Sequence, residues 1–321
     1  MKFLEKSRAL PFPVDNICYD LEDSVTTGDK DSARENAKKI LSLEKAAGIR
    51  EQGVRINSLD SGLAERDLKV VLQAPHIDTI IVPKVHSKAS LSAISDMVMH
   101  LRPPPVHKTP TELDPPTTTN SKTPTELDPP TLKLPKILAL IESARGITDL
   151  PEISTATSLL DGFIFAAEDF ALDLSLTRTP SLTEFLYARS AMVTAARAAD
   201  LGSTIDLVCT AFRDDEGRRR LEEECRNGRG LGFNGKQCIH PTQVPVVQEE
   251  FSPGMGEVEW AVKVMVGDEK AEDRGRGAWT LNGMMIDRPV AERAKAVVRR
   301  AEGCGLNVEK VRRRWEGLEP E

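Results

Sequence analysis

Seven short runs of apolar, often β-branched residues recur along this chain, and each ends on charged or polar residues. They span residues 16–23, 53–57, 79–85, 136–143, 161–169, 203–210 and 232–240. Their length and composition are typical of strands buried on both faces of a parallel sheet. Stretches of helical period lie between them, among them residues 29–48, 87–102 and 181–200. This alternation predicts an α/β fold with a parallel sheet and crossover helices.

The kind of parallel sheet follows from a missing motif. An open, doubly wound sheet usually carries a glycine-rich phosphate turn after its first strand, and the chain has none there. A closed (β/α)8 barrel accounts better for the polar residues at the strand ends. Such a barrel needs one more strand, whose place is before Met1, with residues 2–10 as the following helix. We therefore expect a TIM (β/α)8 barrel over residues 1–251 that lacks its first strand, in an N-terminally truncated sequence.

Residues 103–135 interrupt the barrel pattern. The decapeptide KTPTELDPPT occurs twice there, at 108–117 and at 122–131. Dense proline and threonine cannot continue a helix or bury a core, which favours a disordered loop on the far side of the barrel. A docking or modification site is the alternative.

The tail has a different pattern. Two helical stretches, 255–273 and 287–303, flank the turn-rich segment RGRGAWTLNGMMIDRP. We expect residues 252–321 to form a C-terminal helical extension that packs away from the barrel, with a neighbouring subunit as one surface for it.

Composition narrows the class of protein. Among 321 residues, 43 are Lys or Arg and 50 are Asp or Glu, and the net charge of −7 argues against nucleic-acid binding. No stretch approaches the ~18 apolar residues that span a bilayer. Five scattered cysteines without a CxxC pair indicate neither a zinc site nor a disulfide framework. No secretory signal opens the chain, so we expect a cytoplasmic protein, or a mitochondrial matrix protein whose leader preceded this sequence.

Two carboxylates end neighbouring predicted strands, Glu142 in LIES and Asp169 in AAED. Their separation of 169 − 142 = 27 residues is one strand–helix unit, so both would face the same mouth of the barrel. Two oxygen ligands, with water and substrate in the remaining positions, suit Mg²⁺. The alternative is that each carboxylate caps a helix or pairs with a nearby arginine.

Arg55 ends the run GVRIN at the same mouth. Its planar guanidinium suits bidentate capture of a carboxylate, and a structural ion pair with Glu22 or Asp23 is equally open. Because Asp20, Glu22 and Asp23 all end the first run, we expect Glu22 or Asp23 to orient Arg55 or to bind metal-coordinated waters. Lys84 would support the same cluster electrostatically.

Other polar residues carry weaker signals. A lone His240 is more often a hydrogen-bonded structural residue than a base, so the backbone of Ile239 and His240 is the better candidate for ligand contact. Lys2 and Lys6 lie one helical turn apart and could meet a phosphate, although composition alone makes them ordinary solvated lysines.

These motifs also occur together in the order of a known family. They read YDLEDSV, KDSAR, VRIN, VPKV, LIESARG, FAAEDFALDL, GFNGKQCIHPTQ and GAWTLNGMMIDRP. From about residue 1 to 303, the chain resembles the HpcH/HpaI aldolase and citrate lyase superfamily, in its citrate lyase β-subunit-like branch. The resemblance implies a TIM barrel, usually a homotrimer, that binds Mg²⁺ and acts on acyl-CoA thioesters. The family's opening strand, which reads like RSxLyVPG, is not present.

Matched position by position, the resemblance makes Glu142 and Asp169 the metal ligands and Arg55 the carboxylate clamp. It implies an Mg²⁺-dependent carbon–carbon lyase of the oxo-acid-lyase type, which cleaves citramalyl-CoA or malyl-CoA to acetyl-CoA and a 2-oxoacid. The alternatives are malate-synthase-like condensation, thioester hydrolysis, a citrate lyase β subunit within a complex, and an inactive truncated homologue.

The resemblance also assigns residues outside the metal pair. Asp287, in MMID, matches an acid that the tail inserts into the active site of the next subunit and that would exchange the acetyl-CoA methyl proton. The sequence alone makes Asp287 a helix N-cap before Pro289. Lys2 and Lys6 match positions that hold the CoA phosphates, and Ile239–His240 matches a backbone contact to substrate.

Overall fold

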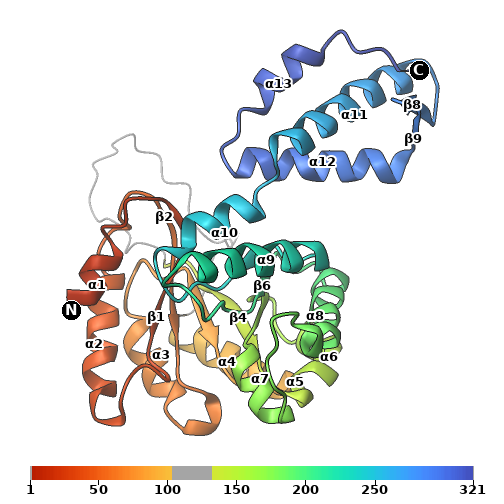
Figure 1. Cartoon of the computed structure of the whole chain (residues 1–321). Coiled ribbons are helices and arrows are strands. Elements are labelled where there is room, and N and C mark those ends of the chain that lie inside the picture. Colours follow the sequence, from red (N-terminus) through yellow and green to blue (C-terminus); the bar gives the residue numbers. More distant parts are fainter. Residues whose placement is uncertain (1, 103–131, 321) are drawn as a thin grey trace, which may run out of the picture. The chain divides into compact units, whose positions relative to one another are not determined.

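The structure, a computed structural model, describes residues 2–102 and 132–320. Residues 103–131, which hold most of the predicted insert, lie outside the described residues. The chain divides into two compact units, Met1–Val244 and Pro245–Glu321, and each is described by itself (Figure 1).

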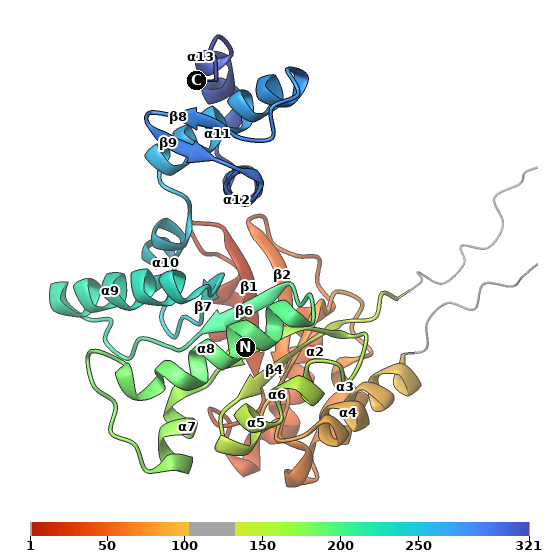
Figure 2. The ribbon, with the colours of Figure 1, turned by 90° about the vertical axis from the view of Figure 1, so that its right-hand side faces the viewer.

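The first unit is built on a parallel sheet whose strands follow chain order (Figures 1 and 2). Its strands are β1 (Val14–Asp20), β2 (Ile49–Arg55), β3 (Thr79–Val82), β4 (Lys136–Ile141), β5 (Leu160–Phe165), β6 (Ser203–Asp206) and β7 (Gly235–Lys236). Each overlaps one of the seven predicted runs, and every neighbouring pair is parallel. Within the described residues the sheet has seven strands, with β1 and β7 at its ends. The curled sheet confirms the predicted barrel class.

Helices connect the strands and cover the outer face of the sheet (Figure 2). After α1 (Lys2–Ser7), which precedes β1, they are α2 (Lys30–Leu41), α3 (Ala64–Val71), α4 (Lys88–Leu101), α5 (Ala144–Thr148), α6 (Leu150–Ile153), α7 (Ala167–Leu174), α8 (Leu186–Ala198) and α9 (Asp215–Leu231). The helix predicted over 29–48 ends early, at Leu41. Gly48 adopts a left-handed conformation (φ 87°) immediately before β2, which redirects the chain into the strand.

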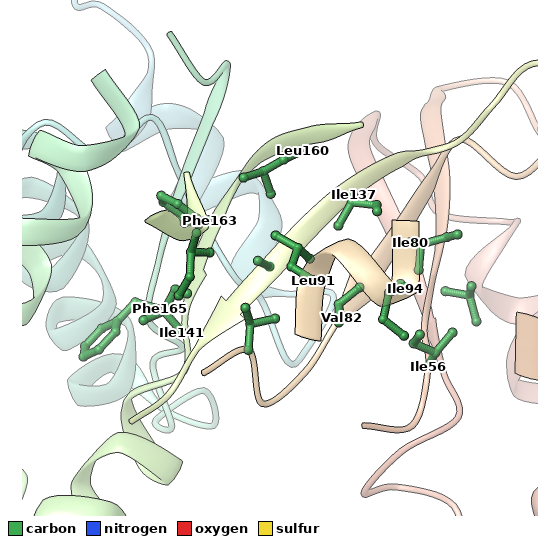
Figure 3. Packing of buried hydrophobic residues seen from close by; sticks show 14 of the residues in the cluster. Ile56, Ile80, Val82, Leu91, Ile94, Ile137, Ile141, Leu160, Phe163 and Phe165 are labelled. Carbon is green, nitrogen blue, oxygen red and sulfur yellow. The ribbon is translucent and has the colours of Figure 1, made fainter. Parts of the chain in front are cut away.

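Side chains of the central strands alternate between two cores. Ile80 and Val82 of β3 lie in the large cluster between sheet and helices, whereas Ile81 belongs to a smaller cluster on the opposite face. Figure 3 shows Leu91 and Ile94 of α4 among the strand residues of the large cluster. Burial on both faces explains why the strands read as continuous apolar runs in the sequence.

The second unit has a core of its own, built from helices and a hairpin (Figure 1). Its elements are α11 (Met255–Asp273), β8 (Trp279–Leu281), β9 (Met284–Ile286), α12 (Arg288–Gly303) and α13 (Val308–Trp315). The connecting α10 (Gln243–Phe251) begins just before the boundary, whereas the predicted division follows residue 251.

Both predicted tail helices are present, but the tail is not purely helical. Residues Asn282 and Gly283, both at positive φ, turn the chain between the antiparallel strands β8 and β9. Asn-Gly is the strongest short signal for such a hairpin, and it stands in the sequence between Leu281 and Met284. Among the described residues, no helix combines the length and apolar character that a membrane crossing requires. All five cysteines are free, as expected.

One fully buried ion pair joins the outer helices to the sheet. Arg189 of α8 donates from Nε and Nη2 to the two carboxylate oxygens of Asp206 on β6, at 3.0 and 2.6 Å. Both side chains are essentially inaccessible, at 1% and 0% exposure. Arg189 Nη1 donates to Asn227 of α9 at 2.6 Å. At Gly228 an added Cβ would lie 2.3 Å from Asp206 Oδ2, so glycine lets α9 approach this pair.

We predict that Arg189→Leu lowers the free energy of unfolding by about 3–5 kcal/mol, because it leaves the Asp206 carboxylate buried without its partner. Arg197→Leu, an exposed arginine of the same helix, should change it by less than about 0.5 kcal/mol. Urea unfolding followed by circular dichroism measures both. Equal stabilities for the two variants would show that the pair does not hold this part of the fold.

Candidate active site

Polar residues gather where the strands end. Asp20 and Arg55 are the last residues of β1 and β2, Lys84 follows β3, and Glu142 directly follows β4. The strands are parallel, so their carboxyl ends lie along one edge of the sheet, the position that barrel enzymes use for catalysis.

Arg55 is held by three acids. Its Nε and Nη2 donate to Oδ1 and Oδ2 of Asp20, each at 2.7 Å. Its Nη1 lies 3.0 Å from Glu22 Oε2 and 3.7 Å from Asp23 Oδ2. The predicted ion pair with Glu22 or Asp23 is therefore present, but the bidentate partner is Asp20. The side of the guanidinium that a substrate carboxylate could share is the one bearing Nη1.

Asp20 also organises the loop after β1. Its carboxylate accepts the backbone N–H groups of Glu22 and Ser24, at 2.9 and 3.1 Å, and the Ser24 hydroxyl. Burial opposes its ionisation, but hydrogen bonds from Arg55 and Ser24 outweigh burial and lower the pKa of Asp20 to about 2. Asp20 thus stays ionised and keeps Arg55 in place. From the sequence alone Asp20 is one of three neighbouring acids, and this role was not predicted, although D-x-x-x-S is a local signal for such a turn.

Glu142 is a buried carboxylate that accepts a hydrogen bond from the backbone of a residue at positive φ. Its Oε1 accepts the backbone N–H of Lys84, and its exposure is 5%. Lys84 adopts a left-handed conformation (φ 53°), which is uncommon for a residue other than glycine. Burial, together with the charges of Asp169 and Glu22, raises the pKa of Glu142 to about 8. Glu142 therefore sits where its negative charge is poorly compensated.

Asp169 is near Glu142, as its influence on the Glu142 pKa shows. The expectation that Asp169 ends a strand is wrong, because β5 stops at Phe165 and Asp169 lies in the first turn of α7. The partial positive charge of a helix N-terminus favours an acid at that place. Neither carboxylate is a helix cap, since Ser143 caps α5 and Ala166 stands at the N-cap of α7.

The donor set fits a divalent cation. Five carboxylates stand against two basic side chains here, namely Asp20, Glu22, Asp23, Glu142 and Asp169 against Arg55 and Lys84. Glu22 Oε1 is buried and, within the described residues, has no hydrogen-bond partner, while Lys84 Nζ is 3.7 Å away. Burial raises the pKa of Glu22 to about 7 against the opposing effect of Arg55, and Asp23 adds to the rise. The excess of buried negative charge would be relieved by a bound cation.

The same residues limit how such a cation is held. Across residues 2–102 and 132–320, no three His, Cys, Asp or Glu side chains converge as a ligand set. Glu142 and Asp169 would therefore supply two ligands, with water and substrate as the others, which is the way proteins usually hold Mg²⁺.

A second ionic cluster supports the α7 side of this edge. Arg178 donates to Glu168, the neighbour of Asp169, and to Glu224 and the Val208 carbonyl oxygen, the last two at 2.9 and 3.0 Å. Glu224 Oε2 lies 3.1 Å from Nζ of the fully buried Lys236, an ion pair without hydrogen-bond geometry. Burial opposes ionisation of Glu224, but Lys236 and Arg178 together hold its pKa below the usual range. This cluster was not predicted from the sequence.

The loop after β7 is tied together by one side chain. Gln243 Oε1 accepts the backbone N–H groups of Ile239 and His240, at 2.9 and 3.3 Å. His240 Nδ1 is 2.8 Å from Thr242 Oγ1, and its ring stacks on Phe212 with centroids 4.7 Å apart. These contacts agree with the expected structural role of His240. The two N–H groups are engaged by Gln243, so substrate contact at Ile239–His240 stays a prediction.

Three further predicted residues belong to other elements. Lys2 and Lys6 are one turn apart on α1, and Lys6 is exposed. Asp287 belongs to the second unit, where its Oδ1 accepts the Val290 N–H at 3.2 Å and caps α12. The sequence by itself suggested this capping role. The roles of all three residues toward a ligand stay predictions.

Comparison with known proteins identifies the family. The chain matches the HpcH/HpaI aldolase/citrate lyase family over residues 6–241. It belongs to this family. The chain is 33% identical over 295 residues to the citrate lyase subunit beta of Leuconostoc mesenteroides subsp. cremoris, which covers 92% of this chain and 88% of the relative. It is 32% identical over 304 residues to the mitochondrial citramalyl-CoA lyase of Rattus norvegicus, covering 92% and 81%.

A solved structure supports the family assignment. The crystal structure of CitE from Mycobacterium tuberculosis, in complex with magnesium, acetoacetate and coenzyme A, is 27% identical to this chain with a TM-score of 0.64. The match covers 90% of each chain. This member of the HpcH/HpaI family therefore shares its fold with a relative whose crystal structure contains magnesium.

We predict that metal-free protein becomes less stable as the pH rises from about 5 to about 8. A carboxyl whose folded pKa is raised, here from 4.5 to about 8, stabilises the folded state while protonated and loses that contribution as the pH rises through this window. Glu142→Gln should flatten the slope and raise the melting temperature at pH 8 by about 2–4 °C per kcal/mol regained. Scanning calorimetry in EDTA measures both.

The matched control is Glu152→Gln, an exposed glutamate of α6. It should keep the wild-type pH dependence. If Glu142→Gln and Glu152→Gln show the same slope, burial does not govern the ionisation of Glu142.

Proposed function

We propose that this protein is an Mg²⁺-dependent carbon–carbon lyase of the oxo-acid-lyase type, which cleaves citramalyl-CoA or malyl-CoA to acetyl-CoA and a 2-oxoacid. The observation that carries the proposal is the buried Glu142 beside Asp169, at the strand ends that also bear Arg55. Family membership and the citramalyl-CoA lyase relative support the reaction class.

Glu142 and Asp169 would hold the metal, which as a Lewis acid polarises the substrate oxygens when bound. The Lys84 N–H fixes Oε1 of Glu142 and leaves Oε2 as the oxygen to turn toward the cation. Repulsion among the carboxylates raises the free energy of the ionised site without a cation, and a bound cation would relieve this repulsion.

Arg55 would bind the carboxylate that becomes part of the 2-oxoacid. Because Asp20 occupies Nε and Nη2, the guanidinium plane is fixed before substrate arrives. Cleavage breaks the bond between the carbinol carbon and the acetyl methyl carbon, and the carbinol oxygen becomes the oxo group as its proton passes to solvent water. A preorganised cation at this end lowers the energy of the charge that develops on oxygen.

The electron pair of the broken bond stays on the methyl carbon of acetyl-CoA, which must take up a proton. We assign this proton exchange to Asp287 of a second copy in a homotrimer. Lys2 and Lys6 would bind the CoA phosphates, and the backbone of Ile239–His240 would contact the substrate. The N-cap position holds Asp287 at a fixed place at the start of α12.

The purified protein should convert citramalyl-CoA to acetyl-CoA and pyruvate, or malyl-CoA to acetyl-CoA and glyoxylate, as followed by mass spectrometry. EDTA should abolish turnover, and Glu142→Ala should reduce it about 100-fold or more, because one of two protein ligands is lost. Glu152→Ala, which removes an exposed glutamate, should behave as wild type.

Other product patterns would decide between reactions at the same site. Free CoA with the intact hydroxyacid would indicate thioester hydrolysis, and formation of the hydroxyacyl-CoA from acetyl-CoA and oxoacid alone would indicate a condensing enzyme. Turnover only in the presence of an acyl-carrier partner would indicate a citrate lyase subunit. A folded trimer without any turnover would contradict the proposal.

Arg55→Lys should raise KM for the thioester and lower kcat/KM about 10- to 100-fold, since lysine cannot bridge Asp20 and a substrate carboxylate with a planar fork. Steady-state kinetics at saturating Mg²⁺ measure the change. An unchanged KM would remove Arg55 from substrate binding.

A further inference from the structure

A series of polar contacts, from half-buried Lys30 to fully buried Asp67, lies behind the active-site edge, on the side of α2. Lys30, the first residue of α2, donates from Nζ to three acceptors, the carbonyl oxygens of Leu21 and Glu22 and Oδ1 of Asn57, each at 2.7 Å. An ammonium group has three donors, so this cage uses all of them. Lys30 thereby ties the loop after β1 to the loop after β2.

Asn57 is fixed in turn by Asp67. Both the backbone N–H and Nδ2 of Asn57 donate to Asp67 Oδ2, each at 2.7 Å. Asp67 Oδ1 accepts Nε of Arg34 at 2.6 Å, and Asp67 and Arg34 are 0% and 2% exposed. With Nδ2 committed to Asp67, the Asn57 amide can turn only its oxygen toward Lys30.

This series of polar contacts ends at Glu22, whose carboxylate faces Arg55. Lys30 binds the carbonyl oxygen of Glu22 itself, and the Val25 N–H shares that oxygen at 3.1 Å. The Glu22 carboxylate reaches Arg55 Nη1 at 3.0 Å, the nitrogen that Asp20 leaves for a substrate carboxylate. Any shift of the Glu22 backbone therefore changes what competes with substrate at Arg55.

We propose that Lys30 is a positioning residue, which holds Glu22 so that the Nη1 side of Arg55 is presented to the substrate carboxylate. Lys30 acts through Glu22 and Asn57 and touches no substrate. This inference rests on the proposed function, in which Arg55 binds a substrate carboxylate. It predicts an effect on substrate binding that is larger than the effect on the chemical step.

Lys30→Met keeps the length of the side chain and removes its three hydrogen bonds. We expect KM for the CoA thioester to rise about 10-fold, with kcat changed less than about 3-fold. In an Arg55→Lys background the same substitution should change KM less than about 2-fold, because residues that act as one unit are not additive. Lys38→Met is the matched control, since Lys38 is a half-buried lysine of α2 whose Nζ donates to Gln73, and it should behave as wild type.

Hydrogen exchange supplies a readout that does not need turnover. Lys30→Met should speed exchange at the Glu22, Ser24 and Val25 amides about 10-fold or more, while β5 amides stay at the wild-type rate. Unchanged exchange at these amides, or an equal rise of KM in the wild-type and Arg55→Lys backgrounds, would overturn the role of Lys30. Wild-type protein without turnover would refute the proposed function alone, and the exchange rates would then decide the role of Lys30.

Discussion

The bidentate ion pair between Arg55 and Asp20 joins the ends of β1 and β2, and the rest of the site is arranged around it. Both carboxylate oxygens of Asp20 accept hydrogen bonds from Arg55 and from the turn that follows β1. One carboxylate therefore fixes both the guanidinium and the loop. Because its pKa is held at about 2, this arrangement persists over the whole range in which the protein would work. Arg55 is thereby preorganised, with one edge left for a ligand.

Two other carboxylates of the site, Glu22 and Glu142, show the opposite electrostatic behaviour. Glu22 and Glu142 have raised pKa values because they are buried among other acids with few cations to balance them. A site selected only for stability would neutralise such groups with hydrogen bonds or remove them. Their persistence at the strand ends is expected where a cation completes the charge balance, and it agrees with membership of the HpcH/HpaI aldolase/citrate lyase family.

Two buried ionic networks support this edge from opposite sides. Lys30, Asn57 and Asp67 stand behind the loops after β1 and β2, whereas Arg178 and Glu224 support the start of α7 next to Asp169. Each network links helices of the outer layer to a segment that carries a site residue, the loop after β1 in one case and the first turn of α7 in the other. Small displacements of these helices would therefore move the carboxylates of the site. For this reason we expect the binding constant for substrate to change when residues that do not contact the substrate are replaced.

The sequence by itself determined the local elements, because burial on both faces and the helical period are visible in neighbouring residues. The seven strands, α4 and the tail helices α11 and α12 follow from such patterns, and the quoted motifs sufficed for the family. Only the tertiary structure decided which partners meet. That Arg55 takes Asp20 as its bidentate partner and that Lys30 reaches three loop oxygens depend on contacts between distant segments, and local periodicity carries no information about those.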